Sequence, residues 1–396
     1  MSFPLVFPSI CATFAPKMKQ RRQFFNIITL RLRTLLLVSF VLMGLSALAD
    51  TTFVHRVEAD VVPSMVIQSN SYLRGANPEG EKIENSMLMR LKYTVQQSGN
   101  PERIGAYHGV GLGVLAINRQ LGTPLMAYIV QGAPIVNFSR NVSLNYELNL
   151  GASFGWKPYD AVTNEDNHVL GSPVNVYIGA DVFLRFMVGR HVDLNLGYGY
   201  THYSNANLRM PNESLHAMGV RLSAACYFGR DENISRASLF TADRPDKRWI
   251  TDVVLYGGWK KRSLALPATF GVAGFQISPM YLLNRAFAIG PSLDAVYDHS
   301  INLTTTDVNG DGQLEYEQPQ WSRQAAVGLQ VRAELNVPVF RASCGIGHYV
   351  GGFSTFYETL AMKVDVTRHF FLNIGYCLYN YNYTNNLMLG IGYRIR

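Results

Sequence analysis

Residues 142–156 read VSLNYELNLGASFGW, and this stretch decides the fold. Its odd-numbered positions are polar or glycine, whereas its even-numbered positions are apolar or aromatic: Val142, Leu144, Tyr146, Leu148, Leu150, Ala152, Phe154 and Trp156. Side chains of a β-strand alternate between two faces, so a period of two predicts a strand with one apolar and one polar face. One face suits lipid and the other suits a polar interior, as in a transmembrane barrel.

The same alternation recurs along most of the chain. Residues 174–188 and 327–335 repeat it. In all, the pattern predicts about eight strands on each side of residue 230, near 53–62, 86–96, 105–117, 124–136, 142–156, 173–188, 190–204, 214–228, 248–260, 268–282, 285–298, 324–336, 338–349, 356–366, 369–380 and 386–396. Each strand reaches the ~9–11 residues that cross a bilayer obliquely.

These strands predict an all-β protein, an antiparallel transmembrane β-barrel. About eight strands lie in 50–229 and about eight in 248–396, which fits tandem barrels or one larger barrel of about sixteen strands. The polar linker 230–247 is long for a periplasmic turn and argues for two barrels. A soluble β-sandwich is disfavoured, because the apolar faces are too continuous for a surface in contact with water.

The N-terminal segment has the pattern of a secretory signal. Residues 1–49 hold six basic residues and no acidic ones, with an apolar run from Leu35 to Leu45 and Ala-Leu-Ala at 47–49. A basic region, an apolar region and a small-x-small site predict a signal peptide cut near Ala49. We expect the start at Met18, because the KQRR that follows it alone makes a conventional basic region.

Composition after the leader fits a membrane barrel. The chain has 35 Lys and Arg, and removing the six that lie in the leader leaves 29 basic against 28 acidic residues. The overall basicity therefore does not indicate nucleic-acid binding. Charged residues make up 16% of the chain, below the roughly 25% of soluble domains. The three remaining cysteines, Cys226, Cys344 and Cys377, cannot all pair and indicate no disulfide framework.

Short turns alternate with longer loops. Turns at 139–141 and 189–191 are short, whereas loops at 157–172, 205–213 and 299–323 are longer. Outer-membrane barrels keep short turns in the periplasm and long loops outside the cell. The strand end before residue 205 should therefore lie at the outer leaflet.

A histidine and a serine stand where the apolar face of the strand at 190–204 ends. His202 and Ser204 follow Tyr198 and Tyr200 on the same face, where tyrosines mark a membrane interface. A histidine two residues from a serine on one strand face can act as a base beside its nucleophile. Here the pair would face lipid rather than a water-filled cleft. The alternative is a pair of interfacial polar residues that anchors the barrel or binds lipid head groups.

The residues around this pair resemble a known family. HYSNA at 202–206, followed by Leu208 and by Pro211 and Asn212, resembles the lipid A 3-O-deacylase family of outer-membrane acyl hydrolases. In that family a His-x-Ser-Asn signature with a downstream Pro-Asn lies on the last hairpin of an eight-stranded barrel. The resemblance is specific over about residues 200–229, is compatible with the strands of 50–229 and says nothing of 248–396.

The resemblance implies a set of roles. Ser204 would be the nucleophile and His202 its base, with backbone groups near Asn205, Asn207 and Asn212 forming the oxyanion site. The reaction would be acyl transfer from an ester of lipid A, without a required cofactor. The substrate would be lipid A in lipopolysaccharide, because the nucleophile stands at the depth of the first carbons of an acyl chain.

Two positions depart from the family pattern. Asn207 stands where glycine is common, and His216 stands where the family has a carboxylate. By the alternation of the strand at 214–228, His216 faces the same way as His202, and the hairpin brings the two close. A neutral His216 could accept the ring N–H of His202 but would lend no charge. We expect His216 as the third member, with Glu213 as a substitute carboxylate and an impaired site as the remaining alternatives.

A second motif, DVNGDGQLE at 307–315, resembles the start of a calcium loop. Oxygen ligands alternate along it, glycine occupies the sixth position, and position twelve, normally glutamate, is Gln318. The expected ligands of a structural calcium are Asp307, Asn309, Asp311, Gln313 and Glu315. The alternative is a surface loop rich in Asx turns.

These observations favour an outer-membrane serine esterase that removes an ester-linked acyl chain from lipid A. The alternatives are a non-enzymatic barrel, porin-like or structural, and a calcium-stabilised adhesin or receptor. The acyl position, the role of 248–396 and the oligomeric state are left open by the residues.

Overall fold

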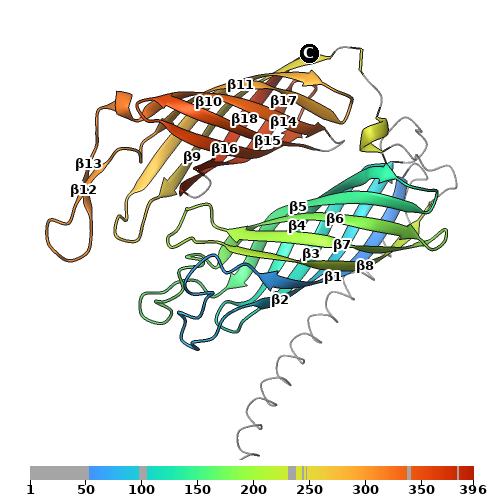
Figure 1. Ribbon diagram of the computed structural model, residues 1–396, viewed down its shortest axis with the longest axis horizontal. Coiled ribbons are helices and arrows are strands. Elements are labelled where there is room, and N and C mark those ends of the chain that lie inside the picture. Colours follow the sequence, from blue (N-terminus) through green and yellow to red (C-terminus); the bar gives the residue numbers. More distant parts are fainter. Residues whose placement is uncertain are drawn as a thin grey trace, which may run out of the picture. The chain divides into compact units, whose positions relative to one another are not determined.

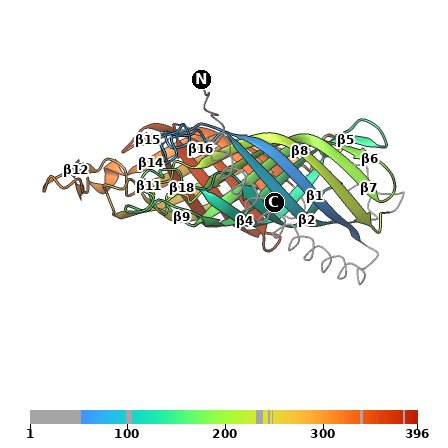
Figure 2. The ribbon, with the colours of Figure 1, turned by 90° about the horizontal axis from the view of Figure 1, so that it is seen from below.

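The computed structural model describes residues 53–97, 105–230, 238–242, 245–246, 248–336, 340–380 and 383–396. Within them, two closed barrels of eight strands each are present (Figures 1 and 2), the first coloured blue through green and the second yellow through red. The expected signal sequence at 1–49 lies outside the described residues, as does part of the linker 230–247.

The first barrel follows the predicted strands closely. Its strands are β1 (Phe53–Val66), β2 (Asn85–Gln97), β3 (Tyr107–Ala116), β4 (Gly122–Asn137), β5 (Val142–Trp156), β6 (Val174–Met187), β7 (Val192–Ser204) and β8 (Leu215–Phe228). Each strand pairs antiparallel with the next, so the order in the barrel is the order in the sequence.

The second barrel is equally close to expectation. Its strands are β9 (Trp249–Lys261), β10 (Thr269–Leu282), β11 (Phe287–Asp298), β14 (Ala325–Asn336), β15 (Phe340–Gly351), β16 (Thr355–Asp365), β17 (Phe370–Tyr379) and β18 (Tyr383–Ile395). A small hairpin of β12 (Thr304–Thr306) and β13 (Glu315–Glu317), which the periodicity did not predict, stands in the loop between β11 and β14.

Each barrel closes on itself. Backbone pairing joins β1 to β8, where Val57 faces Cys226, and joins β9 to β18, where Leu255 faces Ile391. These closing pairs leave no unpaired edge in the eight-stranded sheet of either barrel. The predicted fold class is confirmed, and of the two arrangements that the strand count allowed, the chain adopts two barrels rather than one of about sixteen strands.

The polar strand faces point into the first barrel and are joined by ion pairs. Arg221 Nη2 lies 2.5 Å from Glu58 Oε1 and 3.3 Å from Glu147 Oε2, while Lys92 Nζ lies 2.6 Å from Glu147 Oε1 and 2.6 Å from Asp60 Oδ2. These five side chains are at most 1% exposed. Burying a charge is costly unless it is paired, so a connected network is the way to fill this interior with polar groups.

The second barrel has its own interior network. Asp252 accepts from Lys363 Nζ at 2.7 Å and from Arg394 Nε at 2.6 Å, and Glu334 accepts from Arg394 Nη2 at 2.7 Å. Arg341 Nη1 also reaches Asp252, at 3.1 Å. Both barrels therefore have ion-paired charged residues inside and largely apolar outward strand faces, as the alternation predicted.

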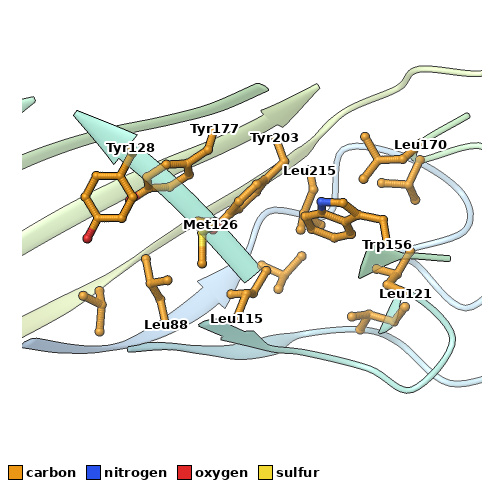
Figure 3. Close-up of a cluster of buried hydrophobic side chains, with 14 of the residues drawn as sticks. Leu88, Leu115, Leu121, Met126, Tyr128, Trp156, Leu170, Tyr177, Tyr203 and Leu215 are labelled. Atoms are coloured by element: carbon orange, nitrogen blue, oxygen red, sulfur yellow. The ribbon is translucent and has the colours of Figure 1, made fainter. Parts of the chain in front are cut away.

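At the end of the first barrel that carries the longer loops, apolar side chains fill the interior (Figure 3). Tyr177 and Tyr203 stack with ring centroids 5.4 Å apart, and Trp156 meets Tyr203 edge-on at 5.1 Å. Leu170, from the loop between β5 and β6, is fully buried in the same cluster. The loops are thus packed onto the barrel mouth by hydrophobic burial.

Two short 3₁₀ turns, η1 (Leu239–Thr241) and η2 (Trp321–Arg323), are the helical elements of the described residues. Neither has the length or the continuous apolar character that a membrane-spanning helix requires.

Candidate active site

The site lies at the end of β7, where inward and outward side chains alternate to the last residue. Leu194, Leu196 and Tyr198 point outward and are 47–63% exposed, and Tyr203 points inward with no exposed surface. By this alternation His202 and Ser204 belong to the outward face. Because Tyr203 is held between Tyr177 and Trp156 (Figure 3), the strand cannot rotate without breaking that packing.

The loop 205–214 turns back sharply after the serine. Ala206 (φ 59°), Asn207 (φ 57°) and Ser214 (φ 65°) adopt left-handed backbone conformations. Glycine and asparagine enter this region at the lowest cost among residues. Asn207 therefore serves where the family pattern commonly has glycine, and this departure is accommodated by the local backbone.

Ser204 is held by donors from this loop. Its Oγ accepts from Asn212 Nδ2 at 2.9 Å and from the Ala206 backbone N–H at 3.2 Å. The Asn205 backbone N–H donates instead to Asn212 Oδ1 at 2.9 Å, and Asn212 Nδ2 also donates to Asn207 Oδ1 at 2.8 Å. The side chain of Asn212, rather than its backbone, is therefore the amide donor placed beside the serine oxygen.

His202 and His216 are direct partners across the hairpin of β7 and β8. Their Nδ1 atoms are 3.2 Å apart and their ring centroids 4.8 Å apart. The Tyr200 hydroxyl lies 2.7 Å from the same Nδ1 of His216. No hydrogen bond between His202 and Ser204 is present in the part of the chain that the structure describes, although the two lie two residues apart on one strand face.

The structure brings together most of the residues that the sequence indicated. Ser204, His202 and His216 meet at the loop end of β7 and β8, as expected from the strand phases, and Asn212 joins them from the loop 205–214. Glu213 does not join them: its side chain is exposed, and its backbone N–H donates to His168 O at 3.2 Å. Sequence reasoning missed Tyr200 as a partner, although it lies on the same face of β7 two residues before His202.

The loop 157–173 supports the serine loop from the side. Ser214 N–H donates to Val169 O at 3.0 Å, and a Cβ at Gly171 would stand 2.6 Å from Met210 O. Within the loop, the Thr163 backbone N–H donates to the Asp160 carboxylate at 2.8 Å, which lowers the pKa of that carboxyl. The loop 205–214, which carries Asn212, therefore packs against the loop 157–173, whose own backbone is held by hydrogen bonds.

The segment 307–315 forms the exposed tip of the loop that bears β12 and β13. The Asp307 carboxylate accepts from the backbone N–H groups of Gly310 at 2.7 Å and Gly312 at 3.1 Å, and Asp311 accepts from that of Gln313 at 2.9 Å. In the described ranges, no group of three or more His, Cys, Asp or Glu side chains is arranged to hold a metal ion. Calcium binding here stays a prediction.

Comparison with known proteins gives two family matches. Residues 82–225 match the family described as lipid A 3-O-deacylase (PagL), and residues 249–396 match the acyloxyacyl hydrolase C-terminal domain. The two matches divide the chain as the two barrels do. No curated protein sequence matches the chain.

Several solved structures show limited similarity. The crystal structure of the outer membrane enzyme PagL is 18% identical with a TM-score of 0.28, and the match covers 42% of this chain and 97% of that one. A refined porin structure is 8% identical with a TM-score of 0.18 over 86% of this chain and 100% of that one. The CymD monoaromatic hydrocarbon channel is 9% identical with a TM-score of 0.19 over 87% and 88%.

Proposed function

Because the chain belongs to the PagL family of lipid A 3-O-deacylases and lies in the bacterial outer membrane, we propose that it is a serine esterase acting on lipid A. It would cut an ester-linked acyl chain, with Ser204 as nucleophile and His202 as base. The observation that carries this proposal is the placement of both residues on the outward face of β7, with the Asn212 amide 2.9 Å from the serine oxygen.

The site suits a lipid substrate. Ser204 is the last residue of β7, and Tyr198 and Tyr200 precede it on the same face, in the position of an interfacial aromatic girdle. The loops at this end are the longer ones, which barrels of this class turn outside the cell. An ester at the base of an acyl chain in the outer leaflet would therefore meet the serine at its own depth.

The chemistry follows from these positions. Ser204 Oγ attacks the ester carbonyl carbon while His202 Nε2 takes the hydroxyl proton, and the carbonyl electrons move to oxygen. The Asn212 amide, which donates to Ser204 Oγ at 2.9 Å, would be a donor to that oxyanion. The tetrahedral intermediate then expels the sugar alkoxide, which receives the proton from His202. Water, deprotonated by His202, attacks the acyl enzyme and releases the fatty acid and free Ser204.

A porin-like function has less support. A porin needs a water-filled interior, whereas Arg221, Lys92 and Glu147 inside the first barrel are completely buried. No observation specifically favours an adhesin or receptor. A structural barrel without enzymatic activity remains as the other outcome of the test below.

The test compares lipid A from cells that carry the wild type, Ser204→Ala or Ser139→Ala, analysed by mass spectrometry. Ser139 lies in the short turn between β4 and β5, so its replacement controls for the loss of a hydroxyl. We expect Ser204→Ala to lower deacylation by several orders of magnitude and Ser139→Ala to keep it, with equal amounts of folded barrel. If lipid A from the wild type and from Ser204→Ala is the same, the esterase proposal is wrong.

A further inference from the structure

Three side chains on the outward face form a line that ends at the proposed base. The Tyr200 hydroxyl is 2.7 Å from His216 Nδ1, and that atom is 3.2 Å from His202 Nδ1. The Tyr200 and His216 rings are also stacked, with an interplanar angle of 29°. Tyr198, on the same face, makes no side-chain hydrogen bond to any residue that the structure describes, so the contact of Tyr200 is particular to its position.

The hydrogen-bonding properties of imidazole limit which nitrogen atoms of His216 and His202 can carry a proton. In a neutral histidine one ring nitrogen donates and the other accepts. If His216 Nδ1 carried the proton, His202 Nδ1 could only accept, and the proton of His202 would sit on Nε2. His202 could then take no proton from Ser204. If His216 Nδ1 is unprotonated, Tyr200 O–H and His202 Nδ1–H can share its single lone pair in a three-centre hydrogen bond, short from Tyr200 at 2.7 Å and longer from His202 at 3.2 Å. His202 Nε2 is then free to act as the base.

We propose that Tyr200 is a positioning residue, which holds His216 in the tautomer that orients His202 for catalysis. The inference rests on the proposed function, because it acts through His202 on Ser204. Tyr200 donates to His216 Nδ1, His216 keeps its own proton on Nε2, and His202 donates from Nδ1. In serine hydrolases a carboxylate, which only accepts, selects the tautomer of the base. Here a phenol and a second imidazole together supply that selection.

The kinetic test uses purified protein in detergent with lipid A as substrate. Tyr200→Phe should lower kcat about tenfold or more and leave KM within about twofold, since the phenol touches the base system and not the acyl chain. Tyr198→Phe removes a hydroxyl from the same face and should keep both constants. Folding of each variant is checked by its heat-modifiable mobility on gels.

The decisive comparison repeats Tyr200→Phe in a His216→Glu background. Glutamate has no tautomer to select, so His216→Glu should retain or raise activity and Tyr200→Phe should then change kcat by less than about twofold. An equal loss of kcat in both backgrounds would mean that Tyr200 acts by packing, and the proposal would fall. Full activity of Tyr200→Phe in the wild-type background would overturn it as well.

A spectroscopic measurement reads the tautomer without turnover. With ¹⁵N-labelled histidine, the wild type should show His216 Nδ1 as an unprotonated nitrogen, and Tyr200→Phe should shift it toward the protonated form. The resonance of His216 is assigned as the signal that is absent from the spectrum of the His216→Gln variant. An unchanged His216 spectrum in Tyr200→Phe contradicts the proposal. If Ser204→Ala is active, the proposed function fails; if Ser204→Ala is inactive while Tyr200→Phe behaves as wild type, the tautomer proposal alone fails.

Discussion

Asn212 has two tasks at the proposed nucleophile. Its Nδ2 donates to Ser204 Oγ at 2.9 Å, while its Oδ1 accepts from the Asn205 backbone N–H at 2.9 Å. The second bond fixes the direction of the amide, since an asparagine side chain that is held at its oxygen presents its nitrogen in one place. A donor fixed before the reaction stabilises a developing oxyanion without further reorganisation.

Replacing Asn212 by aspartate keeps the size of the side chain but removes the donor and adds a negative charge. We expect Asn212→Asp to lower kcat by about 10²–10³-fold, because an oxyanion donor is lost. Asn141→Asp, in a short turn at the other end of the barrel, is the matched control for the added charge. Deacylation by Asn212→Asp within about twofold of the wild type would show that this amide takes no part.

The strand phases were sufficient to predict which residues of the site share a face. His202, Ser204 and His216 follow from the alternation of β7 and β8, because a period of two leaves no choice of side. The role of the Asn212 side chain was not predictable, since it depends on the backbone of the loop 205–214, with its three left-handed residues. The Tyr200 contact likewise depends on a hairpin register that this loop sets.

At the scale of elements, the strands were predicted to within a few residues, whereas the choice between two barrels and one larger barrel was left open. Alternation is local, whereas the pairing of β1 with β8 joins residues such as Val57 and Cys226 that are far apart in sequence. The hairpin of β12 and β13 was missed because each strand has three residues, too few to show a period.

The loop 157–173 should influence catalysis without touching substrate. A Cβ at Gly171 would lie 2.6 Å from Met210 O and 2.8 Å from Pro211 O, directly before Asn212. Gly171→Ala should therefore shift the serine loop and lower kcat about tenfold. Gly189→Ala is the control, because nothing lies within 4 Å of its added Cβ. Equal kcat values for Gly171→Ala and Gly189→Ala would show that the packing of the loop 157–173 does not affect catalysis.

The loop with Asp307, Asn309 and Asp311 belongs to the second barrel, so calcium there should affect stability rather than deacylation. Ligand binding to the native state raises the melting temperature by mass action. We expect the wild type to melt at a higher temperature in calcium than in chelator, and Asp307→Asn with Asp311→Asn to abolish the difference. Identical melting temperatures of the wild type in calcium and in chelator would show that this loop does not bind calcium.

At the scale of the whole molecule, the outward faces of both barrels should contact lipid. Single cysteines at Leu196 (47% exposed) and Leu329 (67%), in a protein without Cys226, Cys344 and Cys377, should be shielded from water-soluble thiol reagents in native membranes. A cysteine at Val162, 89% exposed in the loop 157–173, should react in intact cells. Ready labelling at Leu196 and Leu329 would contradict the transmembrane assignment.

The ion-paired interior of the first barrel has a consequence for the cell that carries it. The side chains of Arg221, Glu58, Glu147, Lys92 and Asp60 are buried and ion-paired in the lumen, so we expect this barrel to offer hydrophilic solutes no aqueous route. The ion-paired Asp252, Glu334, Lys363 and Arg394 in the second barrel lead to the same expectation. We therefore expect that raising the copy number of this protein leaves the permeability of the envelope to hydrophilic solutes unchanged.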